Sequence, residues 1–302
     1  MNPSRRTFLK KSVAALAGST LLGKSVFAFA KKKEIVGIQL YSVRDEMKLN
    51  PLNTLRQLAE MGYRYVEHAN YVDRKFYGYS AVEFKKILSD LGMKMPSGHT
   101  VMKRQHWDET QKDFTKEWKY TIEDAAIMGQ QYVISPSMDE GLRTNYDDLK
   151  QFMEVFNRCG ELCKKSGMQF GYHNHDFEFS QKLNGQTMYD IIMQSTDPKL
   201  VIHQLDTGNL FNGGATALDI VTRFPGRFES MHVKDEIASS SSGEKYESTL
   251  LGKGIARVKE VIDIGRKSGG TIHFIIEQEA YQGKSPLECA KENLAQMKLW
   301  GY

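Results

Sequence analysis

Two histidines and two carboxylates lie close together in the stretch Gly171–Phe179, which begins within the apolar segment Met168–Tyr172. Side chains of a β-strand alternate between its faces, so His173 and His175 would face one side and Asn174 the other. A surface strand with scattered histidines would give the same pattern. If a buried strand ends here instead, both imidazoles enter one cavity, where this residue type could bind a metal ion.

The first thirty residues, 1–30, have the pattern of a twin-arginine signal peptide rather than of a folded domain. Ser4–Lys10 contains the paired arginines, and a moderately apolar run follows over Ser12–Ala30. The run ends in the small-x-small motif Ala28–Ala30, which is typical of a signal-peptidase site. Two glycines and a lysine interrupt the run and argue against a stable membrane span, although an amphipathic anchor is an alternative. We therefore expect a periplasmic or otherwise exported protein.

Export changes the charge balance of the protein. Five of its 41 basic residues precede Lys31, which leaves 36 basic residues against 37 acidic ones. A nearly neutral chain has no basic face of the kind that binds a polyanion, so the composition argues against a nucleic-acid-binding protein.

The chain from residue 34 to residue 302 alternates between short apolar runs and longer amphipathic patterns. The eight β-type runs are Ile35–Leu40, Tyr63–Glu67, Lys94–His99, Gln131–Ser135, Met168–His173, Leu200–Leu205, Phe228–Val233 and Thr271–Glu277. Eight helical patterns accompany them, and this count predicts an α/β fold, a single-domain (β/α)8 TIM barrel over 34–302. An open doubly wound sheet would usually carry a glycine-rich loop after its first strand, and Gln39–Arg44 has none. The longest irregular stretch, Glu236–Gly252, is either a lid or a plain loop.

Polar side chains follow the apolar runs at the strand ends that build the active site of such a barrel. A buried carboxylate or imidazole is costly unless it is paired or bound to a metal. One such residue would mean little, but His173, Asp206, His232 and Glu277 each follow a run of apolar residues. We predict that these four side chains share one divalent metal ion. Nitrogen and oxygen ligands without a thiolate suit Mn²⁺, Zn²⁺, Co²⁺, Fe²⁺ or Mg²⁺.

Seven motifs, in order and spacing, resemble the sugar phosphate isomerase/epimerase branch of the xylose isomerase-like barrel superfamily over residues 34–300. They are Gly37–Arg44, Gly62–Glu67, Tyr172–His175, Leu205–Asn209, Met231–Asp235, Leu251–Gly254 and Ile276–Gln278. The resemblance implies a metal ion held on strands five to eight, with Asp206, His232 and Glu277 at the last three ligand positions. It also implies that the metal polarises a sugar carbonyl while a base removes the neighbouring proton and leaves an enediolate.

The chain departs from this family at the fifth strand, where His173 replaces the glutamate of the ketose epimerases. The two-glutamate proton exchange of those enzymes cannot be carried over unchanged. Dehydratases of keto-inositol type, in the same superfamily, take the same proton and then expel a β-leaving group. We expect a metal-dependent isomerase or epimerase for an unphosphorylated sugar or keto-sugar. The alternatives are a lyase or dehydratase for a keto-sugar or keto-glycoside, a non-catalytic sugar-binding barrel and a metal-dependent nuclease, which the near-neutral charge disfavours.

Three residues are candidates for moving protons or holding charge at this site. Glu277 is the first choice for a base as well as a ligand, although without a metal it would pair with Lys234. His175 either carries a proton or orients His173. Lys234 either holds an oxyanion or a substrate hydroxyl, or pairs with Glu279 or Asp235.

The sugar would be bound by residues on the first strands, by Asn209 and by nearby loops. We expect substrate contacts from Gln39, Glu67, His99, Asn209 and Trp107, although His99 and Trp107 could equally serve the core. The expected partner is a small sugar, without nucleic acid or a stable membrane span, and a homo-oligomer is left open.

Overall fold

Eight parallel strands form one closed barrel in the computed structural model, which describes residues 34–239 and 245–302. Around the barrel, in chain order and closing on the first, these strands are β1 (Ile35–Gln39), β2 (Tyr65–His68), β6 (Lys94–His99), β9 (Tyr132–Ser135), β10 (Gln169–His173), β13 (Val201–Asp206), β14 (Ser230–Val233) and β17 (His273–Ile276). Each of them overlaps one predicted apolar run. The prediction of a single-domain (β/α)8 barrel is confirmed.

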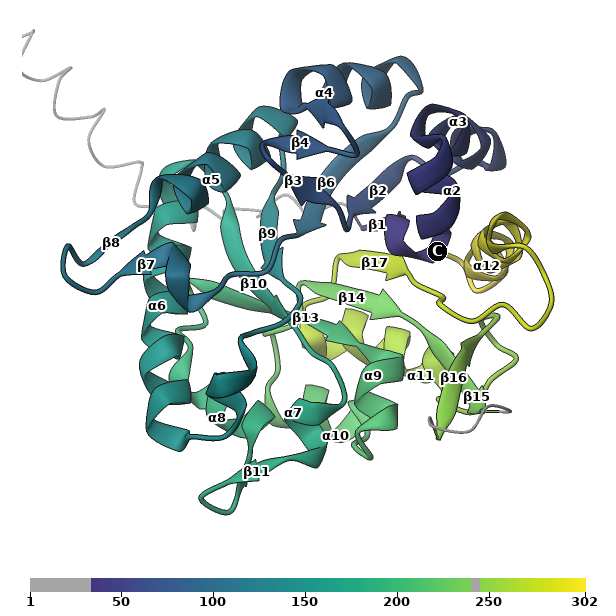
Figure 1. Ribbon diagram of the computed structural model, residues 1–302. Helices are drawn as coiled ribbons and strands as arrows, with labels where there is room; N and C mark the ends of the chain where they lie inside the picture. The colour runs from purple at the N-terminus through teal and green to yellow at the C-terminus, as the bar shows by residue number, and fades with distance from the viewer. Residues whose placement is uncertain (1–33, 240–244) are drawn as a thin grey trace, which may run out of the picture. The chain divides into compact units, whose positions relative to one another are not determined.

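Helices surround the strands on the outside of the barrel (Figure 1). The α-helices are α2 (Arg44–Leu49), α3 (Pro51–Met61), α4 (Ala81–Asp90), α5 (Lys116–Met128), α6 (Tyr146–Lys165), α7 (Phe177–Ser180), α8 (Met188–Ser195), α9 (Thr207–Asn212), α10 (Ala217–Arg223), α11 (Val258–Ile264) and α12 (Pro286–Leu299). Shorter helical turns are η1 (Leu40–Val43), η2 (Arg104–His106), η3 (Glu140–Arg143) and η4 (Gly265–Gly269). Ser80 and Ser285 begin α4 and α12 with capping boxes, and left-handed Gly62 and Gly129 end α3 and α5.

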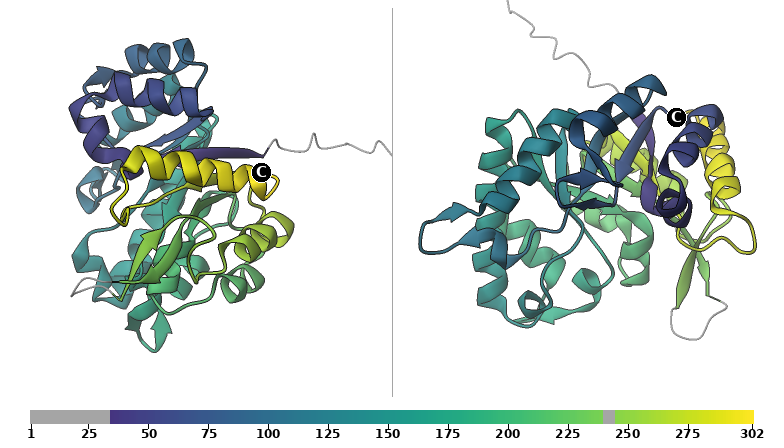
Figure 2. Two further views of the ribbon diagram at one scale, coloured as in Figure 1. Left: turned by 90° about the vertical axis from the view of Figure 1, so that its right-hand side faces the viewer. Right: turned by 45° about the horizontal axis from the view of Figure 1, so that its top comes forward.

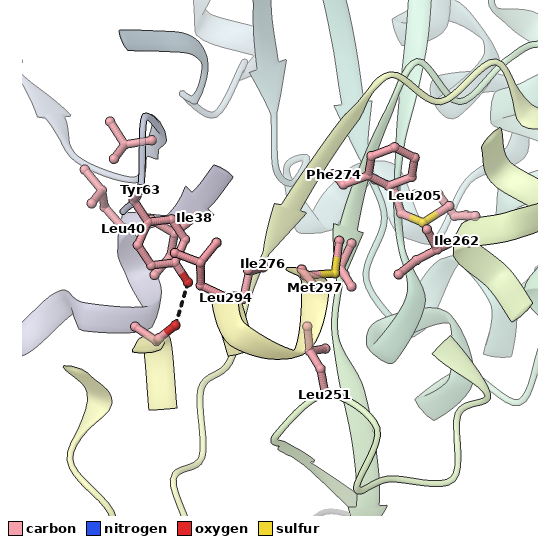
Figure 3. Packing of buried hydrophobic residues seen from close by; sticks show 14 of the residues in the cluster. Ile38, Leu40, Tyr63, Leu205, Leu251, Ile262, Phe274, Ile276, Leu294 and Met297 are labelled. Carbon is pink, nitrogen blue, oxygen red and sulfur yellow. Dashed lines mark hydrogen bonds between the residues drawn. The ribbon is translucent and has the colours of Figure 1, made fainter. Parts of the chain in front are cut away.

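The main hydrophobic layer lies between the strands and the helices. Helix α12 packs against α3, η1 and β17, and Figure 2 shows it running beside β1. Leu294 and Met297 of this helix belong to one buried cluster with Ile38 and Ile276 (Figure 3). The Tyr63 hydroxyl also donates to the Ala290 carbonyl, 2.7 Å away. Burial of side chains of this size stabilises the fold by roughly 1.5–3 kcal/mol each, which fixes the strand ends on which the site depends.

Inside the barrel the side chains change from apolar to polar toward the C-terminal ends of the strands. Ile202, Gln204 and Asp206 are alternate residues of β13 and share its inward face. Ile202 packs in a small apolar cluster, Gln204 makes hydrogen bonds across the barrel, and Asp206 lies among histidines. The polar side chains therefore lie above an apolar layer, nearer the C-terminal ends of the strands.

Short antiparallel hairpins, which the sequence did not predict, lie at the C-terminal end of the barrel strands. They are β3–β4–β5 (Tyr71–Val72, Lys75–Phe76, Tyr79–Ser80), β7–β8 (Trp107–Asp108, Asp113–Phe114), β11–β12 (Lys182–Leu183, Gln186–Thr187) and β15–β16 (Asp235–Ala238, Tyr246–Thr249). The expectation of an irregular Glu236–Gly252 is wrong for its described part, because β15 and β16 pair in antiparallel register from Asp235–Thr249 to Ala238–Tyr246. The Asp235 carboxylate holds the following turn by accepting from the Gly252 and Gly254 amides.

The predicted signal peptide, residues 1–30, lies outside the described residues. Within the described part of the chain, no helix is long and apolar enough to cross a membrane.

Candidate metal centre

Four buried side chains converge at the ends of four neighbouring strands. His173, Asp206, His232 and Glu277 each offer a ligand atom, and these atoms all lie within 4.8 Å of one another. His232 Nδ1 is 3.1 Å from Glu277 Oε2 and 3.6 Å from Asp206 Oδ2, and His173 Nε2 is 3.9 Å from Asp206 Oδ2. Atoms bound at about 2 Å to one ion are separated by roughly 3–4 Å. The spacing therefore fits a shared cation.

The tautomers of the two histidines are set by the groups behind them. His232 Nε2 lies 2.6 Å from Glu67 Oε1, and a carboxylate only accepts hydrogen bonds, so Nε2 carries the hydrogen. Gln204 Nε2 donates to the other oxygen of Glu67 at 2.9 Å, which fixes the orientation of the amide. Gln204 Oε1 then accepts from His173 Nδ1 at 3.1 Å. Each imidazole thus turns its remaining nitrogen toward Asp206 or Glu277, as in carboxylate–histidine–metal arrangements.

Glu67 is the centre of the polar layer beneath these ligands. It accepts hydrogen bonds from Gln39, Ser97, Gln204 and His232, and none of its surface is exposed. Burial alone would raise the pKa of Glu67, but the His99 and His232 imidazoles lower it to about 2. Glu67 therefore remains a carboxylate that holds its neighbours in place.

The placement of Glu67 and Gln39 differs from our expectation that they contact the sugar. Both are fully buried below the ligand cluster, and neither lines the cavity. The sequence placed them at the correct strand ends but one layer too high.

The hydrogen bonding and charge of the four side chains show whether they suit a cation. Asp206 Oδ1 accepts from the Asn209 amide at the start of α9, but the buried Oδ2 has no hydrogen-bond partner among the described residues. Despite burial, Glu277 and Glu67 raise the pKa of His232, so this point demands positive charge. Burial raises the pKa of Asp206, but Lys234 and His232 outweigh it and keep this group ionised. An orphaned carboxylate oxygen and two imidazole nitrogens aimed together fit a divalent ion.

Lys234 supplies part of the countercharge from the side. Its ammonium lies 3.3 Å from Glu277 Oε2 and also pairs with Glu279, which is the alternative that the sequence left open for it. Gly208 makes room for it, because a Cβ there would lie 2.7 Å from Lys234 Cγ. Lys234 also donates to Asn209 Oδ1 at 3.2 Å, and so links the two elements that flank the ligands.

A cavity of about 960 Å³ opens above the ligands. His99, His175 and Asn209 line it, together with His173 and Glu277. Gln204 Oε1 also accepts a hydrogen bond from His99 Nε2, 2.6 Å away.

His175 borders this cavity but lies outside the four-ligand cluster. Its ring centroid is 5.2 Å from that of His173, and burial lowers the pKa of its imidazole. Its backbone amide donates to the buried Glu178, which also accepts from the Tyr172 hydroxyl. The backbone at His175 is therefore anchored, and its ring lies beside His173 without belonging to the ligand set.

Trp107 is the predicted contact that the structure moves furthest from the site. It lies on β7, packs edge-on against Phe114 at a centroid distance of 4.9 Å, and does not line the cavity. The Arg158 guanidinium lies 5.8 Å from its ring. The β7–β8 hairpin directs this ring toward packing neighbours, and a sugar contact by Trp107 stays a prediction.

Several residues of the site were missed in the sequence. Gln204, Ser97 and Ser230 belong to the polar layer around Glu67, and Glu178 supports His175. Gln204 was detectable, because it lies two residues before Asp206 on the same face of an otherwise apolar strand. Ser97 and Ser230 gave no signal, since a small hydroxyl side chain within a strand is ordinary.

Comparison with known proteins identifies the fold family. Residues 55–300 match the family model described as a xylose isomerase-like TIM barrel. The chain belongs to this family. An inosose dehydratase of Clostridium perfringens is 30% identical over 110 residues, 36% of this chain and only 35% of that enzyme, so the match spans about a third of this relative. An inosose dehydratase of Geobacillus thermodenitrificans is 25% identical over 220 residues, 65% of this chain and 72% of that enzyme.

Among solved structures, a sugar phosphate isomerase/epimerase from Parabacteroides distasonis superposes with a TM-score of 0.71. It is 25% identical, and the superposition covers 90% of this chain and 96% of that one. Proteins similar to this chain thus carry the names of two reaction classes, dehydratase and isomerase/epimerase. The family is one of enzymes, and the choice between these classes rests on the site.

Proposed function

We propose that this protein is a metal-dependent lyase that removes a β-leaving group from a keto-sugar or keto-glycoside. This reverses the order of our sequence-based expectation, in which isomerase or epimerase came first. The observation that carries the proposal is the position of His173. Its Nδ1 is engaged by Gln204 and its Nε2 faces Asp206 and Asn209, so the ring belongs to the ligand set. An imidazole that would bind the metal therefore stands where a two-glutamate epimerisation requires its second carboxylate.

The residues of the chain then divide into holding and proton-moving groups. His173, Asp206, His232 and Glu277 would hold a divalent ion, which when bound acts as a Lewis acid on the substrate carbonyl. His175 lines the cavity without joining that set, so we assign it the proton transfer. Elimination needs only one such group, because the base that takes a proton can return it as an acid.

The proposed elimination balances without an oxidant or a reductant. His175 takes the proton from the carbon next to the carbonyl, and the C–H electron pair forms a double bond to the next carbon. The bond from that carbon to its oxygen substituent breaks. The leaving oxygen takes the proton back from His175 and departs as water or as an alcohol.

Product analysis tests this proposal. The full-length protein, loaded with Zn²⁺ or Mg²⁺, is incubated in D₂O with free sugars, inososes, 3-oxidised sugars and 3-oxidised glycosides, and the products are followed by NMR. We expect an unsaturated or rearranged keto-product together with released water or alcohol. Deuterium incorporation with the skeleton and all substituents intact would instead establish isomerase or epimerase activity. Absence of any conversion across the panel would overturn the proposal.

Isomerisation or epimerisation of a keto-sugar is the second candidate. It is supported by the P. distasonis relative, whose superposition covers almost the whole barrel. A non-catalytic sugar-binding role is disfavoured by the complete and buried ligand set.

We also propose that the enzyme is exported through the twin-arginine pathway, on the basis of residues 1–30. Replacement of Arg5 and Arg6 by lysine should retain the protein in the cytoplasm, as measured by cell fractionation. Unchanged export of this variant would contradict the proposal.

A further inference from the structure

The cavity above the ligands is larger than one sugar ring requires. Its 960 Å³ lies near the upper end of the roughly 300–1,000 Å³ of small-molecule sites, which suits drug-sized ligands. From His99 and Glu277 it continues to Tyr71 and Arg74 of the β3–β4 hairpin and to Tyr120 of α5. We call Tyr71, Arg74 and Tyr120 the side wall.

The side wall is held from behind by one buried acid. Arg74 donates to both carboxylate oxygens of Asp124, from Nε at 2.9 Å and from Nη2 at 2.7 Å. The Tyr71 hydroxyl donates to the same carboxylate at 2.6 Å. The guanidinium also lies 4.1 Å from the centroid of the Tyr120 ring. A bidentate pair on a side chain that is only 5% exposed fixes the geometry of the wall before any ligand binds.

The turn of this hairpin contains two residues with a left-handed backbone, and one of them is Arg74. Asp73 and Arg74 have φ values of 50° and 61°, in the left-handed region that glycine and asparagine adopt most easily. The left-handed conformation of Arg74 coincides with the contacts of its side chain to Asp124 and Tyr120.

The lining of this arm is polar as well as aromatic. Lys103, His106 and Glu117 line it opposite the hairpin, and they present hydrogen-bonding groups of both kinds. Tyr120 is 40% exposed. Tyrosines beside hydrogen-bond donors and acceptors suit a ring with an apolar C–H face and hydroxyl groups at its edge. A plain apolar group would make no hydrogen bonds with these polar side chains.

We propose that the side wall is a second subsite, which binds a sugar ring attached to the keto-sugar. This inference rests on the proposed function and deepens it: the substrate is a keto-disaccharide, and the leaving group is its second sugar. That sugar would depart as the alcohol when its bond to the β-carbon breaks.

The test separates the subsite from the chemistry by measuring binding as well as turnover. Arg74→Gly removes the guanidinium but suits the positive φ, so the hairpin keeps its turn. Arg257→Gly is the matched control, because Arg257 is also left-handed at φ 54°, pairs with Glu260 and does not line the cavity. Calorimetry measures the affinity of an unoxidised disaccharide and of its monosaccharide for each metal-loaded variant, and thermal unfolding checks the fold.

We expect Arg74→Gly to weaken disaccharide binding about tenfold or more, equivalent to about 1.4 kcal/mol, and to leave monosaccharide binding within about twofold. Arg257→Gly should change neither affinity. Tyr120→Ala should reproduce the effect of Arg74→Gly. Equal losses for both sugars, or no loss for the disaccharide, would overturn the subsite.

Turnover adds an independent comparison. With 3-oxidised substrates, Arg74→Gly should raise KM for the disaccharide and leave KM for an aryl glycoside unchanged. An equal effect on the aryl glycoside would show that the wall recognises an apolar group and would overturn the assignment to a sugar. If no substrate eliminates but Arg74→Gly still loses disaccharide binding selectively, the proposed reaction fails and the subsite stands.

Discussion

The ligand cluster and the side wall are built in opposite ways. The four ligands come from neighbouring strands, are buried, and are oriented by a polar layer centred on Glu67. The side wall comes from a hairpin and a helix and is partly exposed. It is held mainly by the Asp124 carboxylate, which accepts hydrogen bonds from Arg74 and Tyr71. The barrel strands therefore position the residues of the chemistry, whereas the loops determine how large a substrate fits above them.

Asp206→Asn should have the largest effect. The amide can still accept from the Asn209 backbone and cap α9, so the fold should persist, but the anionic ligand is lost. We expect metal affinity to fall by more than about 100-fold, beyond the loss typical of an outer-layer change, and turnover to disappear. Metal analysis by mass spectrometry after dialysis measures this. Full metal content in the variant would show that the ligand set is wrong.

His175→Ala should separate proton transfer from metal binding. Because this ring lines the cavity outside the ligand set, we expect the variant to keep its metal while kcat falls by about 10²–10⁴-fold. Metal analysis and steady-state kinetics on one preparation give both values. Loss of the metal together with activity would make His175 part of the metal centre instead.

Glu67→Gln should have a smaller effect on the metal than Asp206→Asn. Glu67 touches no substrate, but it fixes the tautomer of His232, and loss of such a partner typically weakens metal binding about 10–100-fold. Ser97→Ala, which removes another hydrogen bond to Glu67 and leaves His232 in place, is the control and should bind metal nearly normally. An equal loss in both variants would mean that Glu67 acts through general packing.

Asp124→Asn should damage the side wall and spare the ligand cluster. The change weakens two charge-assisted hydrogen bonds to Arg74, so we expect the free energy of unfolding to fall by about 1–3 kcal/mol. Metal affinity should stay at the wild-type value, and disaccharide binding should weaken. Denaturant unfolding gives the free energy, and calorimetry gives the metal and disaccharide affinities. A loss of metal affinity would show that the two regions are not independent.

Trp107→Ala should have the smallest effect on the reaction. The ring packs against Phe114 and lies outside the cavity, so we expect kcat/KM to change by less than about twofold. A tenfold fall in kcat/KM for any sugar would place Trp107 back in the binding site and extend the side wall to β7.

The same contrast explains what the sequence could reveal. The alternation of apolar runs predicted the barrel, and a polar residue after an apolar run pointed to each ligand, because strand periodicity is local. The height of Glu67 in the barrel depends on how neighbouring strands are staggered. This stagger cannot be read from a single sequence. The side wall depends on a contact between Arg74 and Asp124, which are fifty residues apart. Arg74 lies in the turn between two strands of two residues each, which are too short to show a periodicity, and Asp124 lies on α5.

The central claim is that four side chains bind one divalent ion. Crystals of the protein soaked in Mn²⁺ and measured at a wavelength with manganese anomalous signal test this most directly. We predict a single strong peak bound by His173 Nε2, Asp206 Oδ2, His232 Nδ1 and a Glu277 carboxylate oxygen. Absence of a peak at that point, or a peak held instead by His99 with the other histidines, would contradict the account.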